Sequence, residues 1–244
     1  MKAVIGLGCS FVAGLEAGGK DKSFIKYIGD ALNANVYNFA VEGQGNLGSV
    51  MQLLSNPIDY KSYESIEIFY MPTGLNRIDI INLNYSDSMP FMPVFPSVNS
   101  PGIVPEVYEL EVAYGKYWTV QCQFLNFAYA CSLLKLYTDK PNVNLTVFPA
   151  FNREYEKKLF DITIKRNNLE KNIPWDKFIK VDNCTNFFDW AVKQSGSEWK
   201  ASMLDSHFQP RDKSLDGWIE ERFHPSAKAH KLLAERLIKN VYNG

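Results

Sequence analysis

Short apolar segments alternate with helical segments along most of this 244-residue chain. The apolar segments are rich in Val, Ile and Leu, as strands buried on both faces are, and the segments between them carry apolar residues at helical spacing. This alternation predicts a three-layer α/β/α sandwich whose parallel sheet has about five strands. The expected strands are residues 2–7, 36–39, 65–71, 143–148 and 178–181, and the expected helices are residues 22–33, 47–54, 118–137, 152–168, 186–194 and 226–242.

One stretch interrupts the alternation. Residues 77–116 are rich in Pro, Asn, Ser and aromatic residues and show no clear period. A segment of this length without regular structure is typical of a functional loop or a small subdomain, and its aromatic content argues against disorder, although a floppy insertion is the plainer interpretation. We expect a single domain over residues 1–244 with an irregular insertion at 77–116.

Composition excludes several classes of partner. The net charge is −1, so there is no overall positive field to hold nucleic acid or an anionic membrane surface. No apolar run approaches the roughly 18 residues of a membrane-spanning helix. The N-terminal apolar stretch is short, enters a glycine turn and has no A-x-A site after it, so it indicates a first strand rather than a signal peptide. The expected partner is a small molecule or a glycan.

The cysteines indicate reduced thiols. Cys9, Cys122, Cys131 and Cys184 show no C-x-x-C spacing and lie in apolar or aromatic surroundings. Buried thiols are therefore expected rather than disulfides or a zinc site, which favours synthesis in the cytoplasm. Scattered carboxylates form no metal-ligand spacing, and we expect no metal and no cofactor.

The segment VIGLGCSFVAG runs from the first expected strand into a glycine turn followed by Ser10. Taken alone, Ser10 is either an ordinary turn residue or a nucleophile. Ligands of open α/β sheets bind beyond the carboxyl ends of the strands, which is where Ser10 falls. The loops 38–45 and 73–77 follow the second and third expected strands and converge on the same edge.

A candidate base lies near the other end of the chain. His224 precedes the last expected helix, with Pro225 stiffening the backbone and Ser226 placed to cap that helix. Glu221 stands three residues earlier, a spacing that brings a carboxylate near the imidazole in a turn. A carboxylate on one ring nitrogen fixes the tautomer, and the other nitrogen then takes a proton from a serine hydroxyl.

The pieces GCSFVAG, NFAVEGQGN, TGLN and ERFHP, in this order, resemble the SGNH (GDSL-type) hydrolase family, in the GCSF variant often carried by bacteriophages. The resemblance covers both ends of the chain and not its middle. It implies a flavodoxin-like sheet and a serine hydrolase with no metal requirement.

The family's roles carry over residue by residue. Ser10 matches the nucleophile, His224 matches the base, and Glu221 stands where the family usually has an aspartate. The backbone N–H groups of Ser10 and Gly43 and the side-chain amide of Asn76 match the oxyanion hole. Donors of this kind are each worth about 10²–10³ in rate.

Three departures from the family pattern leave alternatives open. Cys9 replaces the aspartate of the first block; it is also an alternative nucleophile, although the turn is expected to aim it away from the edge. Arg77 replaces the aspartate of the third block, and is either a binding group for an anionic part of the substrate or a surface ion-pair partner. Glu221 is longer than aspartate, and some members are similar to a Ser–His dyad oriented by a backbone carbonyl.

Three further residues are expected to have other roles. His207 is a candidate substrate contact. His230 lies on the last expected helix among lysines, and we expect it to be solvated. Asn46 lies near the start of a short helix and is expected to cap it.

The resemblance implies hydrolysis of a short acyl ester, most often an O-acetyl group on a carbohydrate, through an acyl-serine. In this interpretation the 77–116 insertion walls one side of the cleft. Two alternatives stay open: an inactive carbohydrate-binding or virion structural protein on the same fold, and a thioesterase or lysophospholipase-like hydrolase.

Overall fold

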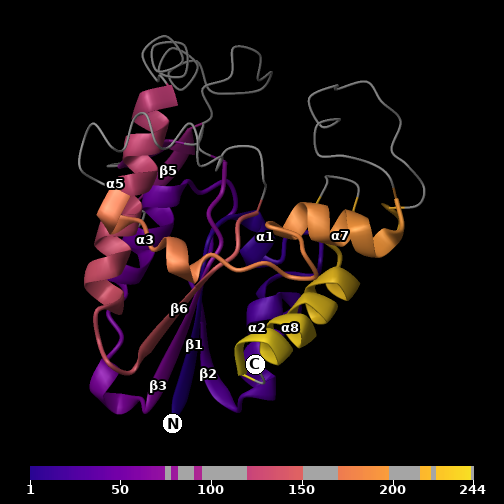
Figure 1. The fold of residues 1–244 in the computed structure, drawn as a ribbon, viewed down its shortest axis with the longest axis horizontal. Coiled ribbons are helices and arrows are strands. Elements are labelled where there is room, and N and C mark those ends of the chain that lie inside the picture. The colour runs from indigo at the N-terminus through magenta and orange to yellow at the C-terminus, as the bar shows by residue number, and fades with distance from the viewer. Residues whose placement is uncertain are drawn as a thin grey trace.

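The centre of the molecule is a parallel sheet. The computed structural model describes residues 1–74, 78–81, 91–94, 120–150, 170–197, 215–220 and 224–242. In these residues β1 (Lys2–Leu7), β2 (Ala34–Asn38), β3 (Ser65–Tyr70) and β6 (Val143–Val147) form a four-stranded sheet in the order β2-β1-β3-β6. All of its pairings are parallel, which confirms the expected sheet class (Figure 1).

The fifth expected strand is reduced to isolated bridges. Phe178 makes a single parallel bridge to Val147, and Val181 bridges antiparallel to Cys184. Between the latter two residues the chain reverses at Asp182 and Asn183, whose φ angles are +48° and +66°. Because the chain turns back on itself there, it cannot continue alongside β6 as a strand.

Helices cover both faces of the sheet, which confirms the three-layer arrangement (Figure 1). One layer contains α3 (Asn46–Ser55) and α5 (Val120–Thr138), and the other contains α2 (Phe24–Ala31), α7 (Phe187–Ser195) and α8 (Ala227–Tyr242). The short helix α1 (Ser10–Ala13) follows β1 directly. Single 3-10 turns lie at Lys20–Lys22, Tyr60–Ser62, Glu170–Asn172 and Trp175–Lys177.

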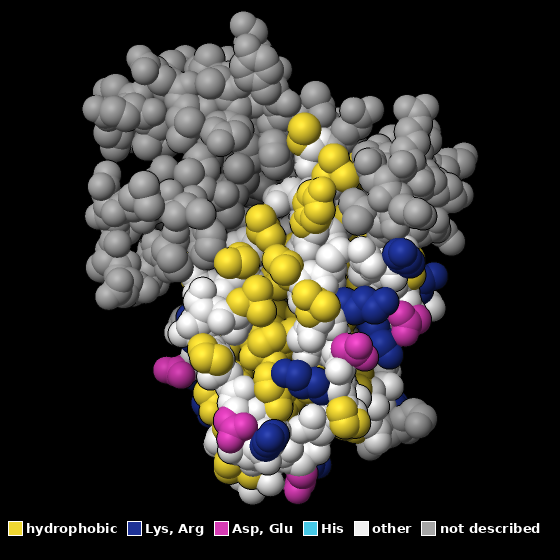
Figure 2. Space-filling model, turned by 90° about the vertical axis from the view of Figure 1, so that its left-hand side faces the viewer, with side chains coloured by type: hydrophobic (Ala, Val, Ile, Leu, Met, Phe, Trp, Pro, Cys, Tyr) yellow, Lys and Arg dark blue, Asp and Glu magenta, His cyan; other side chains and the backbone are white. Residues whose placement is uncertain are grey.

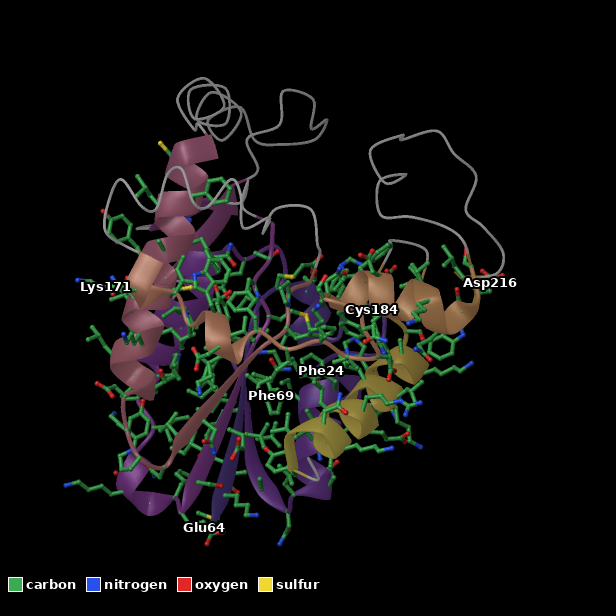
Figure 3. All side chains as sticks on the ribbon, viewed as in Figure 1. Phe24, Glu64, Phe69, Lys171, Cys184 and Asp216 are labelled. Carbon is green, nitrogen blue, oxygen red and sulfur yellow. The ribbon has the colours of Figure 1, made fainter. Side chains whose placement is uncertain are left out.

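Alternating side chains of β1 divide the core into two clusters. Ile5 and Leu7 pack with α3 and α5, whereas Val4 packs with α2 and α8 on the opposite face. On the α2 side the rings of Phe24 and Phe69 meet edge to face, with their centroids 6.4 Å apart (Figure 3). Burial on both faces explains why the strands have continuous apolar sequences.

Side-chain caps set the helix starts. Ser23 accepts a hydrogen bond from the backbone of α2, and Asn186 accepts one from Asp189 N in α7. Ser226 Oγ accepts from Ala229 N at 3.2 Å, which confirms the expected cap of α8. The expected helix at 152–168 lies outside the described residues.

The segment expected to be irregular contains regular structure. Strands β4 (Ile78–Ile81) and β5 (Phe91–Val94) pair antiparallel as a separate two-stranded sheet. The rest of 77–116 lies outside the described residues. Short strands broken by proline, such as Phe91–Val94, give no readable period in the sequence.

Helix α5 is apolar on more than one side. Phe127 and Leu134 are fully buried, while Tyr129 and Leu136 are exposed. Hydrophobic side chains gather on the face of the molecule shown in Figure 2. Within the described part of the chain, no helix combines the length and the hydrophobicity needed to cross a membrane.

His230 joins α8 to α2, and the expectation that it is solvated is wrong. Its side chain is fully buried, its ring stacks on Phe24 at 6.0 Å, and it meets Phe187 edge to face at 5.1 Å. Its Nδ1 accepts a hydrogen bond of 3.2 Å from Phe24 N. That amide belongs to the first turn of α2, where no partner exists within the helix. Sequence reasoning missed this because the lysines around His230 lie on other sides of the helix.

His230 predicts a loss of stability in acid. Burial, helped by the neighbouring His224, lowers the pKa of His230 from 6.5 to about 3. Below about pH 6.5 the imidazole of His230 therefore binds a proton in the unfolded chain, but it stays neutral in the folded chain until about pH 3. The contribution of His230 to the free energy of unfolding is fully present above that pH. Between about pH 6.5 and about pH 3, the free energy of unfolding falls by about 1.4 kcal/mol per pH unit.

Urea unfolding of the wild type and of His230→Gln, each at several pH values, measures this effect. Glutamine offers a hydrogen-bond acceptor but does not titrate, so the variant is expected to be less stable at neutral pH and to lose stability less steeply in acid. Equal slopes for the two proteins would show that other groups cause the acid sensitivity.

Candidate active site

The turn after β1 places Ser10 at the edge of the sheet. β1 lies between β2 and β3, so the connection from β1 to β2 runs to one side of β1 and the connection from β2 to β3 returns to the other side. Ligands of open α/β sheets bind at such a switch point. The turn is tight, because a Cβ on Gly8 (φ +154°) would lie 2.8 Å from the Met71 carbonyl oxygen. Ser10 then begins α1, which ends at Gly14 in the left-handed conformation.

Ser10 and His224 meet across almost the whole length of the chain. Ser10 Oγ lies 2.9 Å from His224 Nε2, within hydrogen-bond distance. The Ser10 side of this pair is enclosed, with 3% of the residue exposed. A serine hydroxyl held on an imidazole nitrogen is the arrangement of an activated nucleophile and its base.

Backbone and ring contacts hold His224 in place. The preceding segment folds back on it: Glu220 N donates to the His224 carbonyl oxygen at 2.7 Å, and Ser226 N donates to Trp218 O at 2.9 Å. The ring of Phe11, next to Ser10 in sequence, meets the imidazole edge to face at 5.4 Å. The imidazole therefore has one orientation set by both neighbouring segments.

The second imidazole nitrogen contacts a carboxylate that sequence reasoning missed. His224 Nδ1 lies 3.0 Å from Glu16 Oε2, in the loop after α1. The side chains of His224 and Glu16 are 15% and 18% exposed. Glu221, the carboxylate predicted for this position, lies outside the described residues. The available signal for Glu16 was an acidic residue in a glycine-rich loop directly after the helix that begins at Ser10.

Polar side chains hold the surrounding loops together. Ser49 Oγ, on α3, lies 3.2 Å from Gly8 O and 2.8 Å from Gly45 O, which links the loops after β1 and β2. Asn38, at the end of β2, donates to Val12 O in α1 at 2.8 Å. Neither residue was singled out in the sequence, since a lone Ser or Asn carries no signal of a distant partner.

Asn46 links the loops after β2 and β3, and the expectation that it caps α3 is wrong. Gly45 is the N-cap, and Asn46 is the first helical residue. Asn46 Oδ1 accepts from Thr73 N at 2.9 Å and from the Tyr70 hydroxyl at 3.1 Å, while its Nδ2 donates to Thr73 O at 3.2 Å. The side chain thus fixes the start of the loop that leads to the predicted third block.

Of the remaining residues that the sequence singled out for the site, some are described by the structure and others are not. Gly43 lies in a turn after β2 with φ +75°, a conformation that glycine adopts without strain. Cys9 is fully buried among the apolar side chains of the core beside α2, whereas the contact with His224 is made by Ser10. Asn76, Arg77 and His207 lie outside the described residues.

A cavity of about 480 Å³ lies between the loops that follow β1 and β2. Its walls include Ala13, Leu15, Ala40 and Val41, and Glu16 lines it as well. The walls are mainly apolar, so the cavity suits an uncharged part of a ligand.

The chain has no match among protein-family models and none among curated proteins. Among solved structures it is similar to TesA, with a TM-score of 0.48, 10% identity, and coverage of 100% of this chain and 99% of that one. It is also similar to a member of the lipolytic protein G-D-S-L family from Veillonella parvula DSM 2008, with a TM-score of 0.47, 11% identity, and coverage of 100% and 99%. An acetyl xylan esterase, Est2A, from Butyrivibrio proteoclasticus has a TM-score of 0.47 and 13% identity, and the match covers 99% of this chain and 63% of that one.

Removing the Asn46 side chain tests the loop network. In Asn46→Ala the buried Thr73 amide and Tyr70 hydroxyl lose this partner, and the free energy of unfolding is expected to fall by about 1–3 kcal/mol. Urea unfolding measures the change. Asn56→Ala, an exposed asparagine at the other end of α3, is the matched control and is expected to change stability less. Equal effects in the two variants would contradict the assigned role of Asn46.

Proposed function

We propose that this chain is a serine esterase that cleaves a carboxylic ester through an acyl-serine intermediate. The observation that supports it most directly is the 2.9 Å contact between Ser10 Oγ and His224 Nε2 at the switch point of the sheet. The resemblance of the quoted motifs to SGNH hydrolases points to the same chemistry.

In the first half of the reaction, Ser10 Oγ attacks the carbonyl carbon of the ester while His224 Nε2 takes the hydroxyl proton. The tetrahedral intermediate collapses, and the leaving alkoxide receives that proton from His224. The products of this half are an alcohol and an acyl-serine.

In the second half, His224 Nε2 takes a proton from water, and the hydroxide attacks the acyl carbon. The second tetrahedral intermediate expels Ser10 Oγ, which recovers its proton from His224. A carboxylic acid is released, so one ester and one water give one acid and one alcohol, with the enzyme unchanged.

The negative charge that develops on the carbonyl oxygen needs donors held in advance. We assign this role to the backbone N–H groups of Ser10 and Gly43 and to the side-chain amide of Asn76, as the motif resemblance implies. The contacts of Ser49 with the loops after β1 and β2, and those of Asn46 with the loop after β3, support this assignment because they tie together the segments that carry these donors.

For the substrate we propose a short acyl ester, with an O-acetyl group on a carbohydrate as the first choice. The apolar cavity beside Glu16 favours an uncharged group. A panel of p-nitrophenyl esters from acetyl to long acyl chains separates this substrate class from a lysophospholipase-like one, and acyl thioesters separate it from a thioesterase.

Replacement of Ser10 tests the proposed chemistry. Ser10→Ala removes the nucleophile, so hydrolysis of p-nitrophenyl acetate is expected to fall by about 10³-fold or more, and labelling by a fluorophosphonate probe is expected to disappear. Ser55→Ala, an exposed serine at the end of α3, is the matched control and should keep both activities. A wild-type protein that is neither labelled nor active, yet still binds glycans, would favour the inactive binding protein.

A further inference from the structure

We infer that Glu16, from the nucleophile's own loop, is the positioning carboxylate of His224, and that Glu221 is not needed for this role. The inference rests on the proposed esterase function and names a part of its machinery that the motif resemblance places elsewhere. The contacts of the two imidazole nitrogens of His224 support it.

Among the residues that the structure describes, each ring nitrogen of His224 has one partner. Nδ1 lies 3.0 Å from Glu16 Oε2, and Nε2 lies 2.9 Å from Ser10 Oγ. A carboxylate only accepts hydrogen bonds, so Nδ1 carries the proton of the neutral ring and donates it to Glu16. Nε2 then keeps its lone pair toward Ser10, which is the tautomer that a general base requires.

This pairing already uses the one proton on Nδ1. A second carboxylate at Glu221 is therefore not required to select the tautomer. The orientation of the ring is likewise accounted for, by Glu16 on one edge and by Phe11 packing at 5.4 Å. The change from the family's aspartate to Glu221 has no consequence for catalysis under this assignment.

The loop is built to hold Glu16 in an unfavourable conformation. Glu16 has φ +62°, a left-handed backbone conformation that is strained for a residue with a side chain. Backbone hydrogen bonds of 3.0 Å on both sides of it fix the loop: Leu15 N donates to Ser10 O, and Ala17 N donates to Gly14 O. A cost of this kind at a residue that contacts the candidate base is typical of functional positions.

The loop also sets the spacing between the two partners of the imidazole. Because Leu15 N is bonded to the Ser10 carbonyl oxygen, the segment carrying Glu16 is fastened directly to the nucleophile's residue. Ser10 and Glu16 thus form one local unit, and His224 is the single part of the triad that comes from the other end of the chain.

Three substitutions at Glu16 test the assignment by steady-state hydrolysis of p-nitrophenyl acetate. Glu16→Gln removes the charge and is expected to lower kcat by about 10²-fold or more with little change in KM. Glu16→Asp keeps the charge and is expected to recover part of this loss. Glu16→Gly relieves the backbone, since glycine accepts positive φ, so it should fold at least as stably as Glu16→Gln and still lose activity.

Glu221→Gln and Glu235→Gln are made in parallel, the latter an exposed carboxylate on α8, and both are expected to keep kcat within about threefold of the wild type. Proton NMR gives a readout independent of turnover. The hydrogen-bonded Nδ1 proton of His224 is expected far downfield in the wild type and in Glu221→Gln, and to be lost or shifted in Glu16→Gln.

The inference is overturned if Glu16→Gln keeps kcat within about tenfold while Ser10→Ala is inactive, or if Glu221→Gln loses as much activity as Glu16→Gln. Retention of activity in Glu16→Gly, or an unchanged Nδ1 proton in Glu16→Gln, overturns it as well. In these cases an active wild type and an inactive Ser10→Ala leave the esterase proposal standing. A wild type with neither turnover nor labelling removes both proposals.

Discussion

The pairing of β1 with strands on both of its sides is the constraint on which the site depends. The connections that lead to its two neighbours run to opposite sides of β1, and Ser10 follows the carboxyl end of this strand. Gly8 allows the tight turn that leads into Ser10, which is itself buried against His224, and Cys9 packs in the core beside it. The position of Ser10, the proposed nucleophile, thus follows from the order of the strands.

The packing of α8 on α2 brings the two ends of the chain together. His230 makes this contact specific: a buried imidazole accepts the hydrogen bond of an α2 amide and stacks on Phe24. The same helix begins just after His224, so the anchoring of α8 also fixes where the candidate base lies. Stability and the geometry of the site are therefore coupled through one helix, and two of the histidines serve different purposes only a few residues apart.

The polar side chains around the turn after β1 hold the neighbouring segments in place and are not themselves reacting groups. Ser49, Asn38 and Asn46 each connect segments that are distant in sequence, and each uses its side chain to satisfy backbone groups of a loop. Loops that carry donors for a developing charge must be held before the reaction begins, because reorganisation during the reaction would cost rate. Glu16 fits the same logic, since its strained loop is bonded back to Ser10.

The sequence by itself determined the alternation of strands and helices, the place of Ser10 after the first strand and the cap at Ser226, because these depend on local periodicity and local hydrogen bonds. It did not foresee the short pairing at Phe178, the β4–β5 pair or the burial of His230. Only the tertiary structure brought Glu16 to His224, 208 residues away in the chain, where its Oε2 lies 3.0 Å from Nδ1. A contact between two segments that packing brings together does not change the hydrophobic periodicity of either segment. Such contacts therefore cannot be predicted from these patterns and are known only from the tertiary structure.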